Sequence, residues 1–188
     1  MIRFAEDVCS NLDSALRREW LETNGIGGFA SGTINGCNTR RYHGLLVAAT
    51  KPPVGRFVLL SKLEETLIVN GRGYELGTKR YPGLAHPQGF QFPTQFRLDS
   101  FPIFKFSVDG VELEKKLFMV HRQNTAELKY ELIHAPSAAY ERIPSVLVVH
   151  EFVSLEHGLS PTHEDIFVCP HDLDFESIRI EIDISVAL

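Results

Sequence analysis

Cysteine is scarce in this sequence: Cys9, Cys37 and Cys169 are odd in number and far apart. No C-x-x-C pair is present, so the spacing favours neither a disulfide framework nor a zinc site. Free cysteines are typical of a reducing compartment, and the expected location is therefore the cytoplasm.

Long apolar runs and basic stripes are lacking as well. No apolar run approaches the roughly 20 residues that cross a bilayer, and the first seven residues contain no apolar core of a secretory signal. The 19 Lys and Arg residues are scattered along a chain of net charge -5. A nucleic-acid binder normally gathers such residues on one face. The sequence predicts neither a membrane nor a nucleic acid as partner.

Helical periodicity is almost absent too. One stretch, residues 12–21, has it, with Leu16, Trp20 and Leu21 at helical spacing. Asp13 or Ser14 is the expected cap of this short helix. The sequence has no alternation of strands with long helices, which disfavours a parallel α/β fold.

What the sequence does contain is a series of short strand patterns. Apolar runs or apolar–polar alternation predict strands over residues 42–49, 56–60, 63–69, 74–76, 102–108, 111–114, 125–133, 146–153 and 178–186. Residues 70–73 supply a turn for one hairpin, and Asp109 with Gly110 supplies a two-residue type I′ turn for another. We therefore expect an all-β, antiparallel β-sandwich with one short N-terminal helical segment, as a single domain over residues 1–188.

Glycine is concentrated in residues 24–33. Gly25, Gly27 and Ala30 match a permissive dinucleotide-binding fingerprint, but that motif works only between a strand and a helix. The residues that follow are poor helix formers, and no Gly-Lys-Ser/Thr is present. We expect a tight loop that uses positive φ, either purely structural or also shaping a ligand site.

A second unusual segment runs from Asn38 to His43, just before an apolar strand. Planar polar groups such as those of Asn and Arg pair with sugar hydroxyls, and an aromatic ring such as Tyr42 packs on sugar C–H surfaces. The same residues suit a buried polar network that fixes the glycine-rich loop to the sandwich. Both interpretations stand, and they are compatible.

Residues 19–29 and 38–49 closely resemble the opening of bacterial and archaeal-type glycogen debranching enzymes, and the likeness continues through residues 56–65. Weaker similarities follow at residues 81–83, 87–89, 96, 114–115, 124–125 and 130. The resemblance covers roughly the first 134 residues. Beyond about residue 135 the sequence departs from the family pattern.

The resemblance implies an N-terminal β-sandwich that packs on a catalytic (α/α)₆ barrel with amylo-α-1,6-glucosidase activity. The catalytic carboxylates of such an enzyme would lie in the barrel, which is absent from this chain. We therefore expect no catalytic residue, cofactor or metal here, and interpret Glu64 and Glu65 as an exposed face or a salt-bridged edge. The expected partners are the barrel and glycogen or a related α-glucan. The expected contact residues are Asn24, Asn38, Arg40, Arg41, Tyr42 and His43.

Other functions are weaker interpretations of the same sequence. The histidines of the last third (His134, His150, His157, His163 and His171) lack a metal-binding spacing, since Ser154 replaces the second His of H-E-x-x-H. A Cys37–His43 nucleophile lacks an orienting partner. A free-standing carbohydrate-binding module is an alternative function, as is a purely structural docking domain. The 13 Phe and single Trp favour a packing domain over an aromatic sugar platform.

Overall fold

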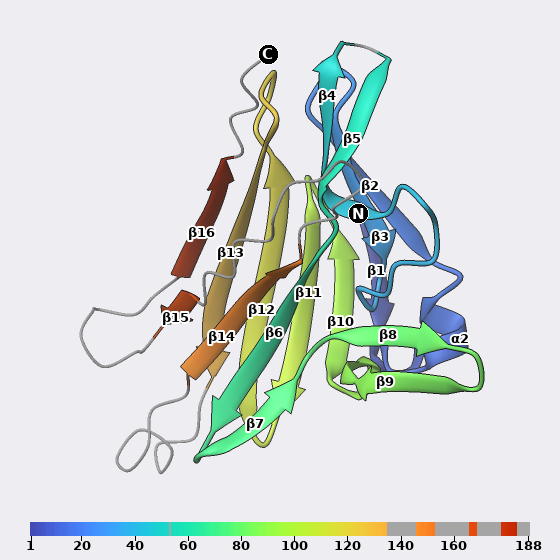
Figure 1. Cartoon of the computed structure of the whole chain (residues 1–188). Helices are drawn as coiled ribbons and strands as arrows, with labels where there is room; N and C mark the ends of the chain where they lie inside the picture. Colours follow the sequence, from blue (N-terminus) through green and yellow to red (C-terminus); the bar gives the residue numbers. More distant parts are fainter. Residues whose placement is uncertain (53, 135–145, 153–165, 169–177, 184–188) are drawn as a thin grey trace.

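The structure, a computed structural model, describes residues 1–52, 54–134, 146–152, 166–168 and 178–183; in the last three segments it describes the strands without their side chains. Two layers of antiparallel strands enclose one hydrophobic core (Figure 1). The all-β antiparallel fold predicted from the sequence is confirmed. Predictions for residues 153 and 184–186, for Cys169 and for the histidines at 157, 163 and 171 lie outside the described residues.

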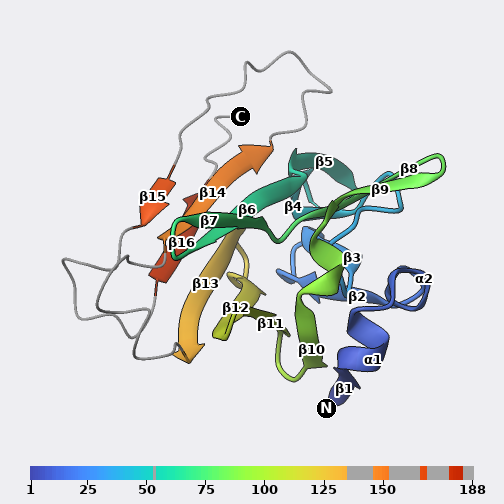
Figure 2. The same cartoon turned by 90° about the horizontal axis from the view of Figure 1, so that it is seen from below.

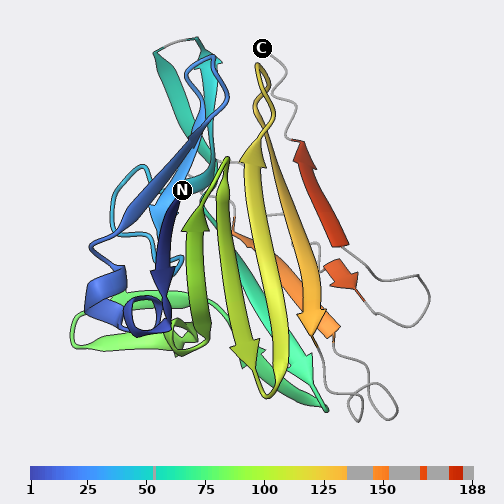
Figure 3. The same cartoon turned by 180° about the vertical axis from the view of Figure 1, so that it is seen from behind.

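The larger layer is a six-stranded sheet, seen face-on in Figure 3. In spatial order its strands are β1 (Ile2–Ala5), β10 (Pro93–Leu98), β11 (Pro102–Val108), β12 (Val111–Met119), β13 (Thr125–His134) and β16 (Ile178–Asp183). Asp109 and Gly110 have φ values of 50° and 82° between β11 and β12. Positive φ at both positions is what a type I′ turn requires, so the predicted hairpin is confirmed.

Two four-stranded sheets form the opposite layer (Figure 2). The first contains β15 (Ile166–Val168), β14 (Val146–Phe152), β6 (Lys62–Val69) and β7 (Arg72–Glu75). The second contains β2 (Glu19–Thr23), β3 (Phe29–Thr33), β4 (Gly44–Lys51) and β5 (Gly55–Leu60). A separate hairpin of β8 (Thr78–Tyr81) and β9 (Leu84–Gln88), followed by the 3₁₀ turn η1 (Gly89–Gln91), extends from one end.

The N-terminal helical segment is shorter than the sequence pattern predicts. It consists of two single turns, α1 (Glu6–Cys9) and α2 (Leu12–Ala15), and the side chain of Asn11 caps α2 by accepting the N–H of Ser14 at 2.9 Å. The expected caps, Asp13 and Ser14, are therefore wrong. Trp20 lies in β2 instead of a helix, because an isolated short helix is marginal whereas strand pairing buries the indole.

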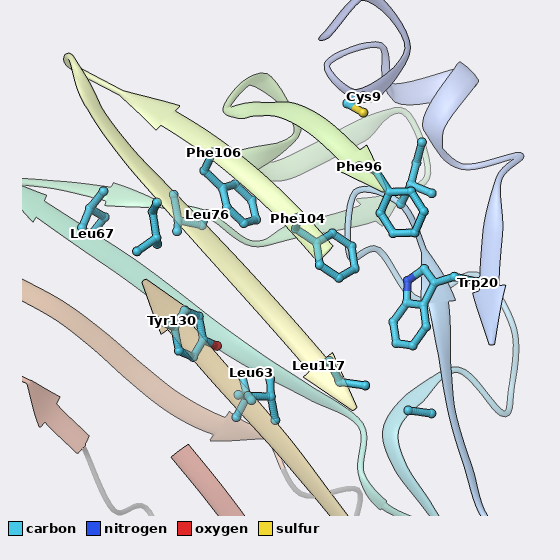
Figure 4. Close-up of a cluster of buried hydrophobic side chains, with 14 of the residues drawn as sticks. Cys9, Trp20, Leu63, Leu67, Leu76, Phe96, Phe104, Phe106, Leu117 and Tyr130 are labelled. Atoms are coloured by element: carbon cyan, nitrogen blue, oxygen red, sulfur yellow. The ribbon is translucent and has the colours of Figure 1, made fainter. Parts of the chain in front are cut away.

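Aromatic side chains at the centre of the core bring the two layers together (Figure 4). The Trp20 indole from β2 meets the Phe104 ring from β11 edge to face, with centroids 5.9 Å apart. Phe96 packs on Phe104 at 5.1 Å in the same T-shaped manner. Such pairs add a geometric preference to the burial of apolar surface. The β2–β5 sheet is therefore held against the six-stranded sheet by specific aromatic contacts.

A buried ion pair also joins the layers. Oε1 of Glu65 on β6 accepts hydrogen bonds from Nζ of Lys115 on β12 and from the hydroxyl of Tyr130 on β13, the latter at 2.6 Å. Burial, reinforced by the adjacent carboxylate, raises the pKa of Tyr130 well above its ordinary value. The interpretation of Glu65 as an exposed or edge residue is wrong, since its exposed fraction is 6%. Glu64 does form an ion pair, at 3.0 Å from Lys79, but its strand β6 is an inner strand of the sheet.

Removal of the ammonium group from this pair is expected to destabilise the domain strongly. Lys115→Met removes the ammonium group to which the Glu65 carboxylate is hydrogen-bonded across the two layers. The free energy of unfolding should fall by about 3–5 kcal/mol, the range for breaking a buried ion pair. Equilibrium unfolding in urea measures this change.

Lys105→Met is the matched control, because Lys105 on β11 forms an ion pair with Glu112 at 2.8 Å in which both side chains are partly exposed. Its cost should be about 0–1 kcal/mol. Equal losses in the two variants would contradict a special role of the buried pair.

Candidate functional site

The β2–β3 hairpin separates the predicted contact residues into two groups. Asn24 lies in the loop after β2, at one end of this hairpin, whereas residues 38–43 follow β3 at the other end. The structure therefore brings Asn38, Arg40, Arg41, Tyr42 and His43 together and leaves Asn24 apart.

Asn24 is completely buried and is hydrogen-bonded within the domain. Its Nδ2 donates to the carbonyl of Gln123 at 2.8 Å, and its Oδ1 accepts the N–H of Ile26 at 3.1 Å. Its backbone carbonyl accepts the N–H of Arg122 at 2.7 Å. Asn24 thus joins the glycine-rich loop to the β12–β13 turn, and its side chain has no exposed surface for a ligand.

The loop after β2 has the tight geometry expected from its glycines. Gly25 and Gly27 have φ values of 80° and 100°, which side chains with a Cβ rarely adopt. A Cβ at Gly25 would also lie 2.7 Å from Cε1 of His121. Asn124 holds this end of the sandwich further: its amide donates to the carbonyl of Ala49 at 3.0 Å and accepts the N–H of Ala49 at 2.9 Å. The asparagine side chain therefore pairs with β4 as another strand would.

Residues 38–43 form a loop whose backbone is fixed by three polar contacts. Nδ2 of Asn38 donates to the carbonyl of Ser61 at 3.1 Å, at the corner between β5 and β6. The N–H of Thr39 donates to Nδ1 of His43 at 3.1 Å, and the hydroxyl of Ser31 donates to the carbonyl of Tyr42 at 3.2 Å. The polar network expected here exists, but it ties the loop to β3 and Ser61, not to the glycine-rich loop.

His43 is buried inside this loop in its neutral form. Because Nδ1 accepts a backbone N–H, the ring proton lies on Nε2, which is 3.7 Å from Oε1 of Glu19. Burial lowers the pKa of His43 although Glu19 opposes the shift. Burial raises the pKa of Cys37. A neutral thiol, and an imidazole already engaged by Thr39, do not form the activated pair that a cysteine nucleophile needs.

Arg40, Arg41 and Tyr42 have exposed side chains at the tip of the loop. Nε of Arg40 donates to Oε1 of Glu19 at 2.6 Å, and the guanidinium of Arg41 lies 5.5 Å from the centre of the Tyr42 ring. The Tyr42 side chain is about half exposed, at 48%. These three side chains offer two cationic planes and an aromatic face on a fixed backbone.

The outer face of the β2–β5 sheet continues this surface. Trp20 and its partner Gly32 face the core, so the neighbouring pair Leu21 and Ser31 faces outward. Leu21 is 57% exposed. Arg56 donates through Nε to the carbonyl of Gly27 at 2.7 Å and lies over the Phe29 ring.

We call Leu21, Arg40, Arg41 and Tyr42 the arginine face; Arg56 is bound to Gly27, toward the other end of the hairpin, and is not part of it. Sequence reasoning missed Leu21. The consecutive apolar pair at residues 20 and 21 was the available signal, since such a pair places apolar side chains on both faces of a strand.

Neither a metal site nor a membrane-spanning helix is found in the part of the chain that the structure describes. No cluster of three His, Cys, Asp or Glu side chains there is arranged to hold a metal ion. None of the described helices has the length and apolarity to cross a membrane.

Loss of the Asn24 side chain should loosen the end of the sandwich that it connects. Asn24→Ala leaves the Gln123 carbonyl and the Ile26 N–H without this buried partner, so the free energy of unfolding should fall by about 1–3 kcal/mol. Hydrogen exchange of residues 24–28 should accelerate. Asn38→Ala, which removes a surface amide, should cost about 0.5–1 kcal/mol and leave that exchange unchanged. Unaltered exchange in Asn24→Ala would contradict the structural role.

The buried imidazole should make stability depend on pH. Since burial lowers the pKa of His43, the unfolded chain binds the proton more tightly than the folded one. Its stabilising contribution is then complete above about pH 6.5 and is lost as the pH falls toward the folded-state pKa. His43→Asn keeps an acceptor near Thr39 without a titratable ring. Melting temperatures of both proteins across this range should converge at low pH, and parallel curves would contradict the assignment.

Comparison with known proteins agrees with the resemblance seen in the sequence. The family model for the glycogen debranching enzyme N-terminal domain matches residues 18–167, which reaches beyond the first 134 residues. No curated protein and no solved structure matches the chain. The matched segment begins just before β2 and includes both loops described above. The chain belongs to the glycogen debranching enzyme N-terminal family.

Proposed function

We propose that this chain is the accessory β-sandwich domain of a glycogen debranching enzyme. As one domain over residues 1–188, it supports hydrolysis of α-1,6 branch stubs in glycogen or a related α-glucan by packing on the catalytic barrel and shaping its glucan cleft. Membership in the N-terminal family supports this assignment. The free, buried Cys9 and Cys37 are compatible with the cytoplasmic location that the proposal includes.

The paired glutamates of β6 have structural partners, which supports a non-catalytic role. Glu65 is buried against Lys115 and Tyr130, and Glu64 forms an ion pair with Lys79. A glycosidase needs one carboxylic acid to protonate the leaving oxygen and a second carboxylate opposite it across an open cleft. Two neighbouring residues on a strand point to opposite faces of the sheet and do not meet that requirement.

The arginine face is the contact surface in this proposal. Its apolar members, Leu21 and Tyr42, are 57% and 48% exposed, and the guanidinium of Arg41 lies 5.5 Å from the centre of the Tyr42 ring. Tyr and Arg are enriched among the residues that dominate binding energies at protein interfaces, and apolar centres with polar rims are the common arrangement. Its cationic character contrasts with the net charge of -5 of the chain. The surface is therefore suited to carboxylates on the barrel.

One observation carries the proposal furthest: the loop is rigid while its tip is exposed. Ser31 and Ser61 hold the backbone of residues 38–43, whereas the side chains of Arg40, Arg41 and Tyr42 remain accessible. Binding orders side chains and loops at a cost in entropy, and a loop that is already fixed avoids much of that cost. In the proposed assembly Arg40 and Tyr42 lie at the border of the glucan cleft, and Leu21 and Arg41 contact the barrel.

Glucose release from a glycogen limit dextrin tests this function. The chain alone should release none, and the debranching-enzyme barrel of the same organism should become active, or more active, when the chain is added. The double substitution Arg41→Ala with Tyr42→Ala removes side chains whose backbone anchors stay in place. About 30-fold more of this variant should be needed for half-maximal activation, as for loss of roughly 2 kcal/mol at an interface centre.

Arg72→Ala is the matched control. Arg72 on β7 stacks on Tyr74 with its guanidinium 5.0 Å from the ring centre, but it lies outside the arginine face. This variant should activate the barrel as the wild type does. Glucose release by the chain alone, or no response of the barrel to the chain, would overturn the proposal. Tight glucan binding without any effect on the barrel would instead indicate a free-standing carbohydrate-binding module.

A further inference from the structure

A partly enclosed cavity of about 40 Å³ lies between the two layers of the sandwich. Trp20, Leu63 and Phe104 form part of its apolar wall. Asn35, Glu65 and Lys115 give the same cavity a polar side. Asn38 and Ser61 line its outer end, beneath the loop of the arginine face. An apolar cavity of this kind stays dry, whereas a polar one holds water when it offers two to four partners.

The amide of Asn35 is the clearest sign that the cavity has an occupant. Oδ1 of Asn35 accepts the N–H of Cys37 at 3.2 Å and lies 2.7 Å from the hydroxyl oxygen of Thr33, so the orientation of the amide is set. Its Nδ2 is buried and has no hydrogen-bond partner among the described residues. The whole residue is 5% exposed. An amide donor left unsatisfied in a core is costly, so a small acceptor beside it is strongly favoured.

The charged wall of the cavity has capacity for further hydrogen bonds. Lys115 donates to Glu65, and Tyr130 donates to the same carboxylate oxygen. An ammonium group has three donors, and a carboxylate has about four acceptor positions, so these two contacts leave capacity on both groups. An ion pair inside a protein is stable only when such remaining positions are also satisfied.

We propose that this cavity is an internal hydration site, occupied by water that accepts from Asn35 Nδ2 and hydrates the Lys115–Glu65 pair. Water both donates and accepts, which fits a wall that carries donors and a carboxylate. An anion would accept from Asn35 but would be repelled by Glu65, and a cation would be repelled by Lys115 and Lys62, which also lines the cavity. At about 10–15 Å³ of probe volume per molecule, a cavity of about 40 Å³ has room for about three to four waters.

Gly32→Ala tests the proposal because Gly32 lines the cavity. Its added Cβ would meet the Trp20 ring at 3.5 Å, an ordinary van der Waals contact, so the methyl group occupies space without a clash. If water is displaced from Asn35, the melting temperature should fall by about 3–8 °C. A dry cavity would instead be filled favourably, and the melting temperature would rise.

Gly73→Ala is the matched control in another strand. Its Cβ would meet Cγ2 of Thr66 at 3.4 Å, away from the cavity. This variant reports the general effect of replacing glycine in a strand, and its melting temperature should change little or rise. Trp20, the one tryptophan of the chain, lines the cavity, so its emission should shift to the blue in Gly32→Ala but not in Gly73→Ala.

A high-resolution crystal structure of the wild-type chain completes the test. Ordered water within hydrogen-bond distance of Asn35 Nδ2, together with the loss of stability in Gly32→Ala, supports the proposal. A dry cavity, a Gly32→Ala variant as stable as Gly73→Ala, or a chloride ion at the site with stability that follows chloride concentration would overturn it. None of these outcomes depends on debranching activity, so the proposed function stands or falls separately.

Discussion

The Glu65 carboxylate links the two layers of the sandwich, and much of the remaining arrangement depends on it. It extends from β6 to a lysine on β12 and a tyrosine on β13, so a single side chain engages three strands of two sheets. Taking these charges out of water is costly, and their attraction compensates only when the geometry is correct. The pair therefore restricts how β6 lies over the larger sheet. The polar side of the cavity between the layers is a direct result.

Side-chain amides perform a similar task at the two ends of the β2–β3 hairpin. Asn24 and Asn124 fix the glycine-rich loop to the β12–β13 turn and to β4, and Asn38 fixes the other loop to the β5–β6 corner. Amides suit this role because they donate and accept at once. Loops anchored in this way keep their shape without secondary structure of their own. The exposed tip at residues 40–42 is consequently presented on a stable base.

The residues that carry the resemblance to debranching enzymes are scattered along the sequence, yet several meet in the fold. Glu65 belongs to the strong part of the resemblance, and Lys115 and Tyr130 belong to the weak part, but together they form one buried cluster. Trp20 and Asn24 similarly meet Phe104 and Gln123 across the sandwich. Much of the family pattern is thus explained by packing and by loop anchoring. Packing does not explain the residues of the arginine face, since Leu21 and Tyr42 remain exposed.

Local pattern alone determined the all-β class, the β6–β7 and β11–β12 hairpins and most central strands of this protein. The alternation of apolar and polar residues, and Asn-Gly or Asp-Gly turns, each involve only a few neighbouring positions, so they can be recognised in the sequence. The sequence did not reveal that residues 19–23 form a strand, because the same residues also match a helical spacing and only the partner β3 resolves the choice. Tertiary structure alone decided which polar residues are buried, because burial of a polar group depends on partners distant in the sequence. Glu65 is buried against Lys115, 50 residues away, and Asn24 is buried with a hydrogen bond to Gln123, 99 residues away, whereas Arg41 is exposed.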